Sequence, residues 1–247
     1  MKLAGKTAIV TGGGRDIGAA AARKLAAEGA NVAISYFESA KGADNVVADI
    51  EAAGGKAIAV QADLNMQEGV DKLVGATLDR FEGIDVLVNN AGGLIARKTL
   101  AEMDLAHWNA VMTLNLTSTF MMTKACLAHM KSGTIVNLAS QAGRDGGGPG
   151  AVAYAASKGA IMTMTRGLAK ELGPDIRVNA LCPGMIDTDF HNIHTPDAGR
   201  RGFEANATMQ RQGHVDDAAN LVMFLASDAS AFLTGTNIDI NGGMLFS

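Results

Sequence analysis

Short apolar runs alternate with longer Ala-rich or amphipathic segments along almost the whole chain of 247 residues. The short runs are typical of strands and the longer segments of helices, because the two elements differ in length and hydrophobic period. The runs are apolar throughout, as in parallel strands that are buried on both faces. We therefore expect an α/β fold: one doubly wound parallel sheet of about seven strands with helices on both faces.

The expected strands cover residues 6–11, 31–36, 56–61, 85–89, 134–138, 176–181 and 236–240. The expected helices cover residues 17–28, 40–53, 66–81, 100–131 (one long or kinked helix), 152–172 and 215–225. Residues 187–212 are polar and predicted to be irregular, forming a small substrate-binding lobe. No linker or internal repeat interrupts this order, so residues 1–247 are expected to form a single domain.

Composition excludes several classes of partner. With 21 basic and 25 acidic residues, the net charge of −4 gives no electrostatic reason to expect nucleic acid or an anionic membrane. Cys126 and Cys182 lie in apolar stretches and are expected to be buried, reduced thiols. An apolar signal segment and a membrane-spanning run are both missing from the sequence, which favours the cytoplasm.

A metal site is not expected. His191 and His194 are three residues apart, but no cluster of carboxylates or thiolates accompanies them, and the other histidines are scattered. We expect these two side chains to line or cover a substrate pocket.

The first expected strand ends in a glycine-rich turn, residues 11–18, with the sequence Thr-Gly-Gly-Gly-Arg-Asp-Ile-Gly. A turn without side chains, followed by a helix, lets backbone amides receive a pyrophosphate, as in Rossmann-type folds. The alternative is an ordinary tight connection between strand and helix. A Walker phosphate-binding loop is excluded, because no Gly-Lys-Ser/Thr follows.

Tyr154 and Lys158 are four residues apart in the expected helix 152–172, so their side chains share one face. A nearby ammonium favours the phenolate, and lowering the tyrosine pKa by about 2 to 3 units requires roughly 3 to 4 kcal/mol. Such a pair suits the proton transfer that accompanies interconversion of an alcohol and a carbonyl. Taken alone, it is also compatible with an ordinary helix surface.

Several motifs in order resemble the short-chain dehydrogenase/reductase family over residues 6–243. They are the glycine-rich turn, Asn89-Asn90-Ala91-Gly92, Asn115, Ser140, Tyr154-x-x-x-Lys158 and Pro183-Gly184. The resemblance implies a Rossmann-type oxidoreductase that interconverts a ketone and a secondary alcohol. It implies that Tyr154 transfers the proton, that Lys158 also binds the nicotinamide ribose, and that Ser140 hydrogen-bonds the substrate oxygen. It further implies that Asn115 holds a water connecting Lys158 to solvent.

The resemblance also implies a set of cofactor contacts: Gly12, Gly14, Arg15, Asp16, Ile17, Gly18, Tyr36, Asp63, Leu64, Asn90, Ala91, Gly92, Tyr154, Lys158, Pro183, Gly184, Ile186 and Thr188. Among these, Asp63 would meet the adenine, or would merely cap the next helix. NAD-preferring members carry an acid at the end of the second strand, where this chain has Ser35 or Tyr36. With Arg15 available for a 2′-phosphate, NADP(H) is expected over NAD(H). Alternatively, Arg15 is a solvated turn residue and either cofactor serves.

Asp16 departs from the family, which usually has glycine at this position. Its carboxylate would either repel the pyrophosphate or cap the first helix by accepting its free amides. We expect the cap.

The resemblance is strongest to the branch of 3-oxoacyl carrier-protein reductases, so the expected reaction is reduction of a 3-oxoacyl thioester. The alternatives are a sugar or polyol dehydrogenase and a non-catalytic dinucleotide sensor, although a sensor has no use for the proton relay. An acidic carrier protein would need a basic surface beside the pocket, for which Lys124 and Lys131 are candidates, unless they are simply solvated. The resemblance also implies a homotetramer.

Overall fold

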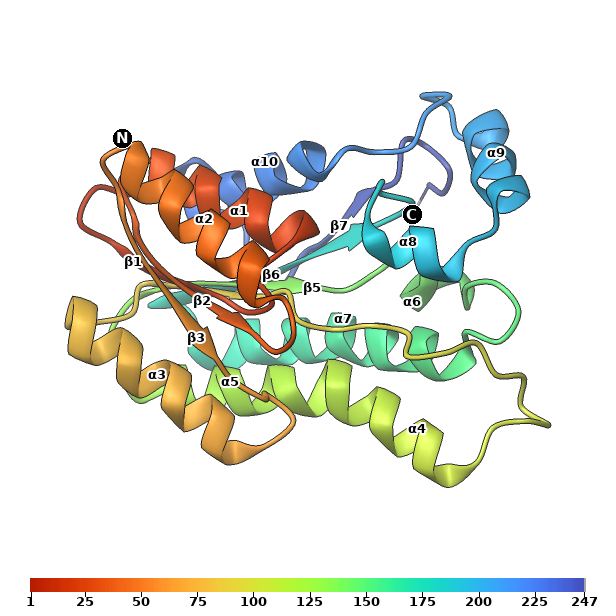
Figure 1. Cartoon of the computed structure of the whole chain (residues 1–247), viewed down its shortest axis with the longest axis horizontal. Helices are drawn as coiled ribbons and strands as arrows, with labels where there is room; N and C mark the ends of the chain where they lie inside the picture. The colour runs from red at the N-terminus through yellow and green to blue at the C-terminus, as the bar shows by residue number, and fades with distance from the viewer. Residues whose placement is uncertain (247) are drawn as a thin grey trace.

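The computed structural model describes residues 1–246, which contain one sheet of seven parallel strands in the order β3-β2-β1-β4-β5-β6-β7 (Figure 1). This confirms the predicted fold class. The strands are β1 (Thr7–Val10), β2 (Asn31–Tyr36), β3 (Lys56–Gln61), β4 (Val86–Asn89), β5 (Gly133–Leu138), β6 (Ile176–Pro183) and β7 (Asn237–Ile240).

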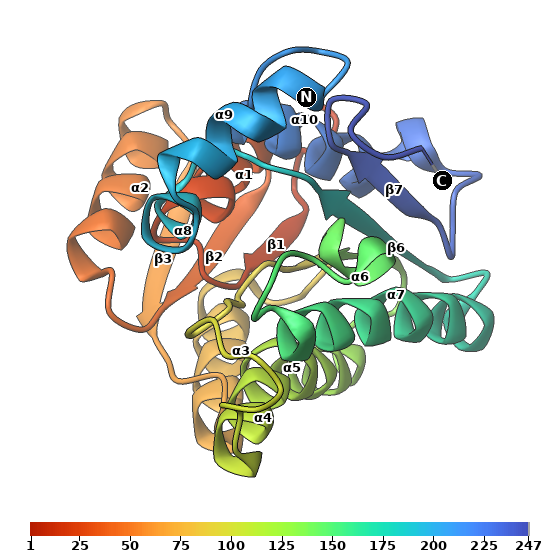
Figure 2. The same cartoon turned by 90° about the vertical axis from the view of Figure 1, so that its right-hand side faces the viewer.

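Helices cover both faces of the sheet (Figures 1 and 2). On one face lie α1 (Asp16–Ala27), α2 (Ala40–Ala52) and α10 (Val215–Ala226), and on the other lie α3 (Gln67–Phe81), α5 (Ser118–Leu127) and α7 (Val152–Leu172). Successive strand residues point to opposite layers, so Val10 packs under α1 whereas Ile9 packs on the other side. Each such fully buried apolar side chain contributes about 1.5 to 3 kcal/mol, which explains why apolar residues predominate in the strands.

The order of the strands reverses at one place. β1 pairs with both β2 and β4, because the chain runs outward to β3 and then returns to the other side of β1. Ligands of doubly wound sheets bind outside the carboxyl ends of the strands at this reversal. Residues 11–15 and 90–93 leave the sheet there.

The helix expected over residues 100–131 begins later and ends earlier than predicted, and a π-helical turn interrupts it. It consists of α4 (Leu105–Met112), a π-helical turn η1 (Thr113–Thr117) and α5. Asp104 determines the start, because its side chain accepts a 2.7 Å hydrogen bond from the His107 N–H and so caps the first turn. The widened π-helical turn contains Asn115.

The prediction of an irregular segment at 187–212 is wrong in detail. This lobe contains α8 (Asp189–His194) and α9 (Asp197–Asn206), two short helices in which polar residues predominate. Two further short helices were not expected: α6 (Ala142–Asp145) and η2 (Asp228–Ser230).

Cys126 and Cys182 are both free and buried, as predicted. Among residues 1–246, no helix is long and apolar enough to cross a membrane. Within the same residues, no group of three or more His, Cys, Asp or Glu side chains could hold a metal ion.

Candidate active site

The glycine-rich turn presents a surface of backbone. Gly12 has a left-handed φ of +63°, which glycine adopts without strain. A Cβ atom at Gly14 would overlap the Ser39 hydroxyl, and one at Gly18 would overlap the Gly12 carbonyl oxygen. Side chains at these positions would therefore push α1 and α2 away from the turn.

Hydrogen bonds tie this turn to the segment after β4. The Thr11 hydroxyl accepts the N–H groups of Asn90 and Ala91, both at 2.9 Å. In return the Asn90 side-chain amide donates to the carbonyl oxygens of Thr11 and Gly12 at 2.8 and 3.0 Å. On the β2 side, the Ser35 hydroxyl accepts the Gly12 N–H at 3.1 Å, so Ser35 supports the turn. Of the two residues considered for the ribose position at the end of β2, this leaves Tyr36.

Sequence reasoning missed the roles of Thr11 and Ser35. In the sequence, each is a small hydroxyl residue at or near the end of an apolar strand. That feature does not identify a hydrogen-bond partner more than twenty positions away.

This turn fits a dinucleotide pyrophosphate. No side chain caps the first turn of α1, and four free N–H groups at a helix N-terminus, together with the helix dipole, favour an anion. The cradle of glycines leaves those amides accessible. Gly12, Gly14, Ile17 and Gly18 are the residues that would hold the pyrophosphate.

The prediction that Asp16 caps α1 is wrong. Asp16 is the first residue of the helix rather than the residue before it, and no cap hydrogen bond forms. Its φ is +51°, a left-handed value that L side chains rarely adopt, which gives a physical reason for glycine at this position. The Asp16 carboxylate instead accepts the N–H of Asp189 at 3.3 Å. Burial raises the pKa of Asp16.

The start of α7 brings Tyr154 next to Ser140, which follows β5. The Ser140 side chain lies close enough to the Tyr154 phenol to act on its pKa, and the Lys158 Nζ lies 5.7 Å from the centre of the Tyr154 ring. That ammonium is buried and donates to the Leu138 carbonyl oxygen at 2.6 Å. The three side chains expected to carry the chemistry therefore lie together.

Asn115 joins the same cluster through the π-helical turn. Its side-chain amide donates to the carbonyl oxygens of Gly93 and Val111, both at 2.9 Å, and its Oδ1 accepts the Gly93 N–H at 3.0 Å. A Cβ atom at Gly92 would lie 2.6 Å from the Asn115 Oδ1 and 3.3 Å from the Lys158 Nζ. Only glycine at position 92 lets both groups approach this segment.

Burial perturbs both titratable groups. It lowers the pKa of Lys158 to about 8. It raises the pKa of Tyr154, and the hydrogen bond with Ser140 opposes that rise by favouring the phenolate. Tyr154 thus rests as a neutral phenol, while Lys158 carries its proton at neutral pH.

A buried polar chain behind this cluster was also missed. The Asn89 side-chain amide donates to Asn137 at 2.9 Å and to Thr123 at 3.1 Å, and Asn137 donates to Thr165 at 2.9 Å. These bonds connect β4 and β5 to α5 and α7. They hold α7, which carries Tyr154, and α5, which continues from the π-helical turn of Asn115, in register with the sheet.

The remaining predicted cofactor contacts lie near the carboxyl ends of the strands. Asp63 makes a turn rather than a cap: its Oδ1 accepts the Asn65 N–H at 3.0 Å, and α3 starts only after Met66. The Pro183 carbonyl oxygen accepts the Gln141 N–H at 2.9 Å, which places the end of β6 beside Ser140. The other members of the set are buried or half-buried near these elements: Leu64, Ala91, Gly184, Ile186 and Thr188.

The lobe places an uncharged face over Tyr154. The Phe190 ring centre lies 5.7 Å from that of Tyr154, and the rings of His191 and His194 lie 5.0 and 5.1 Å from Phe190. Burial, with Arg200 and Arg97 nearby, lowers the pKa of His191 to about 4. His191 is therefore neutral at pH 7.

Lys124 and Lys131 do not lie beside this pocket in the chain. Lys131 precedes β5 and Ser140 follows it, so the two lie at opposite ends of that strand. Lys124 belongs to the last turn of α5, whereas Asn115 precedes the first turn. These two candidates therefore form no basic surface next to Tyr154 in a single copy of the chain, and both side chains are exposed, as the alternative of solvated lysines expects.

A doubly wound sheet with a glycine cradle at its reversal point, next to a Tyr-Lys-Ser cluster, defines a dinucleotide-dependent oxidoreductase. A family model described as Enoyl-(Acyl carrier protein) reductase matches residues 12–245. The chain belongs to the short-chain dehydrogenase/reductase family.

Relatives over the full length include enzymes with different substrates. A 3-oxoacyl-(acyl-carrier-protein) reductase of Synechocystis sp. is 43% identical over 249 residues, covering 98% of each chain. Glucose 1-dehydrogenase 2 of Bacillus subtilis is 35% identical over 250 residues, covering 98% of this chain and 95% of the relative. A short chain dehydrogenase from Burkholderia cenocepacia, solved in complex with NADP, is 39% identical with a TM-score of 0.93, covering 99% of each chain.

Proposed function

We propose that this enzyme reduces a ketone to a secondary alcohol with NADPH, and that its substrate is a 3-oxoacyl thioester. The observation that carries the proposal is the cluster of Tyr154, Ser140 and Lys158 beside the glycine cradle. When bound, the nicotinamide supplies the hydride. The chain must then orient the carbonyl, donate a proton to its oxygen and stabilise the phenolate that remains.

Each side chain suits one of these tasks. The Tyr154 phenol donates the proton, and the Ser140 hydroxyl, which lies near that phenol, holds the carbonyl oxygen next to it. The Lys158 ammonium stabilises the phenolate, since its Nζ lies 5.7 Å from the centre of that ring. Asn115 supports Gly93 and thereby keeps the segment after Gly92 close to Lys158.

The choice of substrate is supported by the lobe. Phe190 and the neutral His191 present an apolar, uncharged face next to Tyr154, which suits an acyl chain better than a polyhydroxylated sugar. A sugar or polyol dehydrogenase is the second candidate, because a glucose dehydrogenase is 35% identical over the full length.

A substrate screen tests the function. NADPH and NADH oxidation would be followed with 3-oxoacyl thioesters, and reduction of NADP and NAD with glucose and other polyols. Turnover of the thioesters supports the proposal, and turnover of polyols alone selects the second candidate. Cofactor binding without turnover of any compound would identify a dinucleotide sensor and overturn both.

The preference for NADP(H) is expected to depend on Arg15. Its guanidinium is exposed and follows Gly14, while no acidic side chain stands at Ser35 or Tyr36. The variant Arg15→Ala should raise the KM for NADPH by about tenfold, the effect of one lost charge-assisted contact, and should change the KM for NADH by less than about twofold. Arg23→Ala is the matched control, because Arg23 pairs with Asp49 on α2. Equal effects of Arg15→Ala on the two cofactors would contradict the assignment.

The pH dependence of reduction should follow Lys158. Its pKa of about 8 means that the ammonium is lost as pH rises through that value, and with it the charge that stabilises the Tyr154 phenolate. We expect kcat/KM for reduction to be level below about pH 7 and to fall above about pH 8. The variant Lys158→Arg keeps its charge throughout this range, so its kcat/KM should not fall above about pH 8. An unchanged fall in that variant would assign the titration to another group.

We also propose a homotetramer. Several large apolar side chains are exposed on the single chain, including Phe120 at 50% on α5 and Phe232 at 103% before β7. Such side chains are candidates for burial between copies. The mass in solution, measured by light scattering, should be four times that of the chain, and a monomer would contradict the proposal.

A further inference from the structure

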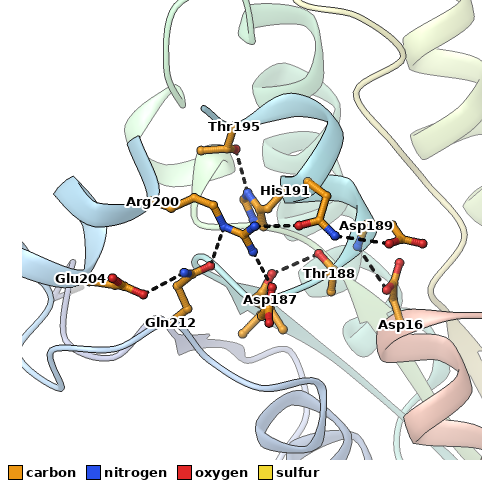
Figure 3. Close-up of polar contacts among 11 residues, drawn as sticks. Asp16, Asp187, Thr188, Asp189, His191, Thr195, Arg200, Glu204 and Gln212 are labelled. Carbon is orange, nitrogen blue, oxygen red and sulfur yellow. Dashed lines mark hydrogen bonds and ion pairs between the residues drawn. The ribbon is translucent and has the colours of Figure 1, made fainter. Parts of the chain in front are cut away.

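A direct link joins the glycine-rich turn to the lobe. The Asp16 Oδ1 accepts the Asp189 N–H at 3.3 Å across 173 positions of sequence, as Figure 3 shows. Arg15 completes the link, since its Nη1 lies 3.6 Å from the Asp189 carboxylate and its Nε 4.0 Å from that of Asp16. The side chains of Arg15, Asp16 and Asp189, with the Asp189 N–H, thus connect the start of α1 to the start of α8.

The backbone conformation of Asp16 indicates that this link has a structural role. A left-handed φ of +51° costs a non-glycine residue free energy. No capping bond to α1 offsets that cost. The hydrogen bond that the Asp16 side chain makes is with the lobe, so the structural role of the aspartate lies between the two segments rather than within the turn.

The lobe behind Asp189 is held together as one unit. Arg200 on α9 pairs with Asp187 and donates to Asn192 at 2.6 Å and Gln212 at 2.9 Å. Gln212 in turn donates to Glu204 at 2.8 Å (Figure 3). Because α8, α9 and residue 212 share this network, a bond at Asp189 restrains the whole lobe.

The next residue after Asp189 is Phe190, whose ring packs against Tyr154 with centres 5.7 Å apart. The position of Asp189 therefore determines where Phe190 stands over Tyr154. A path of direct contacts runs from the glycine-rich turn, through Asp16 and Asp189, to the face that covers the proposed proton donor.

We infer that Asp16 is a positioning residue that fastens the lobe to the glycine-rich turn and so holds Phe190 over Tyr154. The inference rests on the proposed function of Tyr154. Asp16, the residue at which this chain departs from the usual glycine of its family, would thereby have a structural role.

This role should change the affinities for dinucleotide and for substrate in opposite directions. Asp16 places a carboxylate in the turn that fits a pyrophosphate, so removing it should strengthen dinucleotide binding while weakening substrate binding. A residue with a purely structural role would weaken both. Opposite changes in the two affinities therefore distinguish the two roles.

The test compares Asp16→Gly with Asp16→Asn. Glycine removes the acceptor and relieves the left-handed backbone, whereas asparagine tolerates that φ and keeps an oxygen for the Asp189 N–H. In Asp16→Gly, amide hydrogen exchange over 189–206 should accelerate by about tenfold, and the KM for the carbonyl substrate should rise about fivefold, by a larger factor than any change in kcat. In Asp16→Asn, exchange in this segment should stay within about twofold of the parent chain.

Fluorescence titration with NADPH should show tighter binding to both variants. The inference is overturned if exchange over 189–206 is unchanged in Asp16→Gly, or if asparagine accelerates it as much as glycine does. A thermal unfolding scan verifies that Asp16→Gly is folded. Exchange and titration are measured without turnover, so their outcome is separate from the proposed function, which fails if Tyr154→Phe retains activity.

Discussion

Replacing Tyr154 by phenylalanine is expected to lower kcat for carbonyl reduction by about a thousandfold, within the range by which a positioned acid accelerates such reactions. The phenol is the proton donor in the proposed reaction, and Ser140 lies close enough to act on its pKa. The substitution deletes only the oxygen and keeps the ring that packs against Phe190. A thousandfold loss corresponds to about 4 kcal/mol of transition-state stabilisation.

Stopped-flow measurement of NADPH oxidation at saturating substrate checks this expectation. Affinity for NADPH and the thermal midpoint should change little, because the ring still fills its place. Ser140→Ala should also lower kcat, but Tyr154→Phe combined with Ser140→Ala should cost much less than the product of the two losses, since the groups act as a unit. Near-normal turnover by Tyr154→Phe would remove the tyrosine from the mechanism.

The second large effect is expected for Lys158→Met, which should reduce kcat/KM by about a hundredfold or more. Methionine has a similar length but no charge. The phenolate left on Tyr154 after proton transfer would then form in a buried site without the ammonium that lies 5.7 Å from its ring. The Leu138 carbonyl oxygen would also lose its 2.6 Å hydrogen bond.

Lys170→Met is the matched control, because Lys170 is an exposed lysine near the end of the same helix. It should leave kcat/KM unchanged. Steady-state kinetics on both variants, with a titration of NADPH binding, separates loss of chemistry from loss of cofactor. Equal activities of Lys158→Met and Lys170→Met would show that the buried ammonium has no part in the reaction.

The apolar runs allowed most elements to be located from sequence, because hydrophobic period is a local property. The helix expected at 152–172 has those bounds in the structure, and the strands at 31–36 and 56–61 do as well. The lobe helices α8 and α9 escaped detection, since both are short and polar residues predominate in them.

The same division holds in the site. Tyr154 and Lys158 could be paired from their spacing on one helix, and the glycine-rich turn from its place after a strand. Asp16 could not be interpreted from sequence, because a carboxylate near a helix start resembles a cap. Its actual partner, the Asp189 N–H, lies 173 positions away.

By itself the sequence determined the order of the strands and of the longer helices, the position of the backbone cradle and the spacing of the Tyr154–Lys158 pair that we propose for proton transfer. These properties follow from local period, turn composition and short spacing. Only the tertiary structure decided that Thr11 holds the segment after β4, that Asn115 reaches Gly93 from a π-helical turn, and that Asp16 meets the lobe. Those pairings depend on how the helix layers close over the sheet, and this packing brings together groups whose separation along the chain gives no signal.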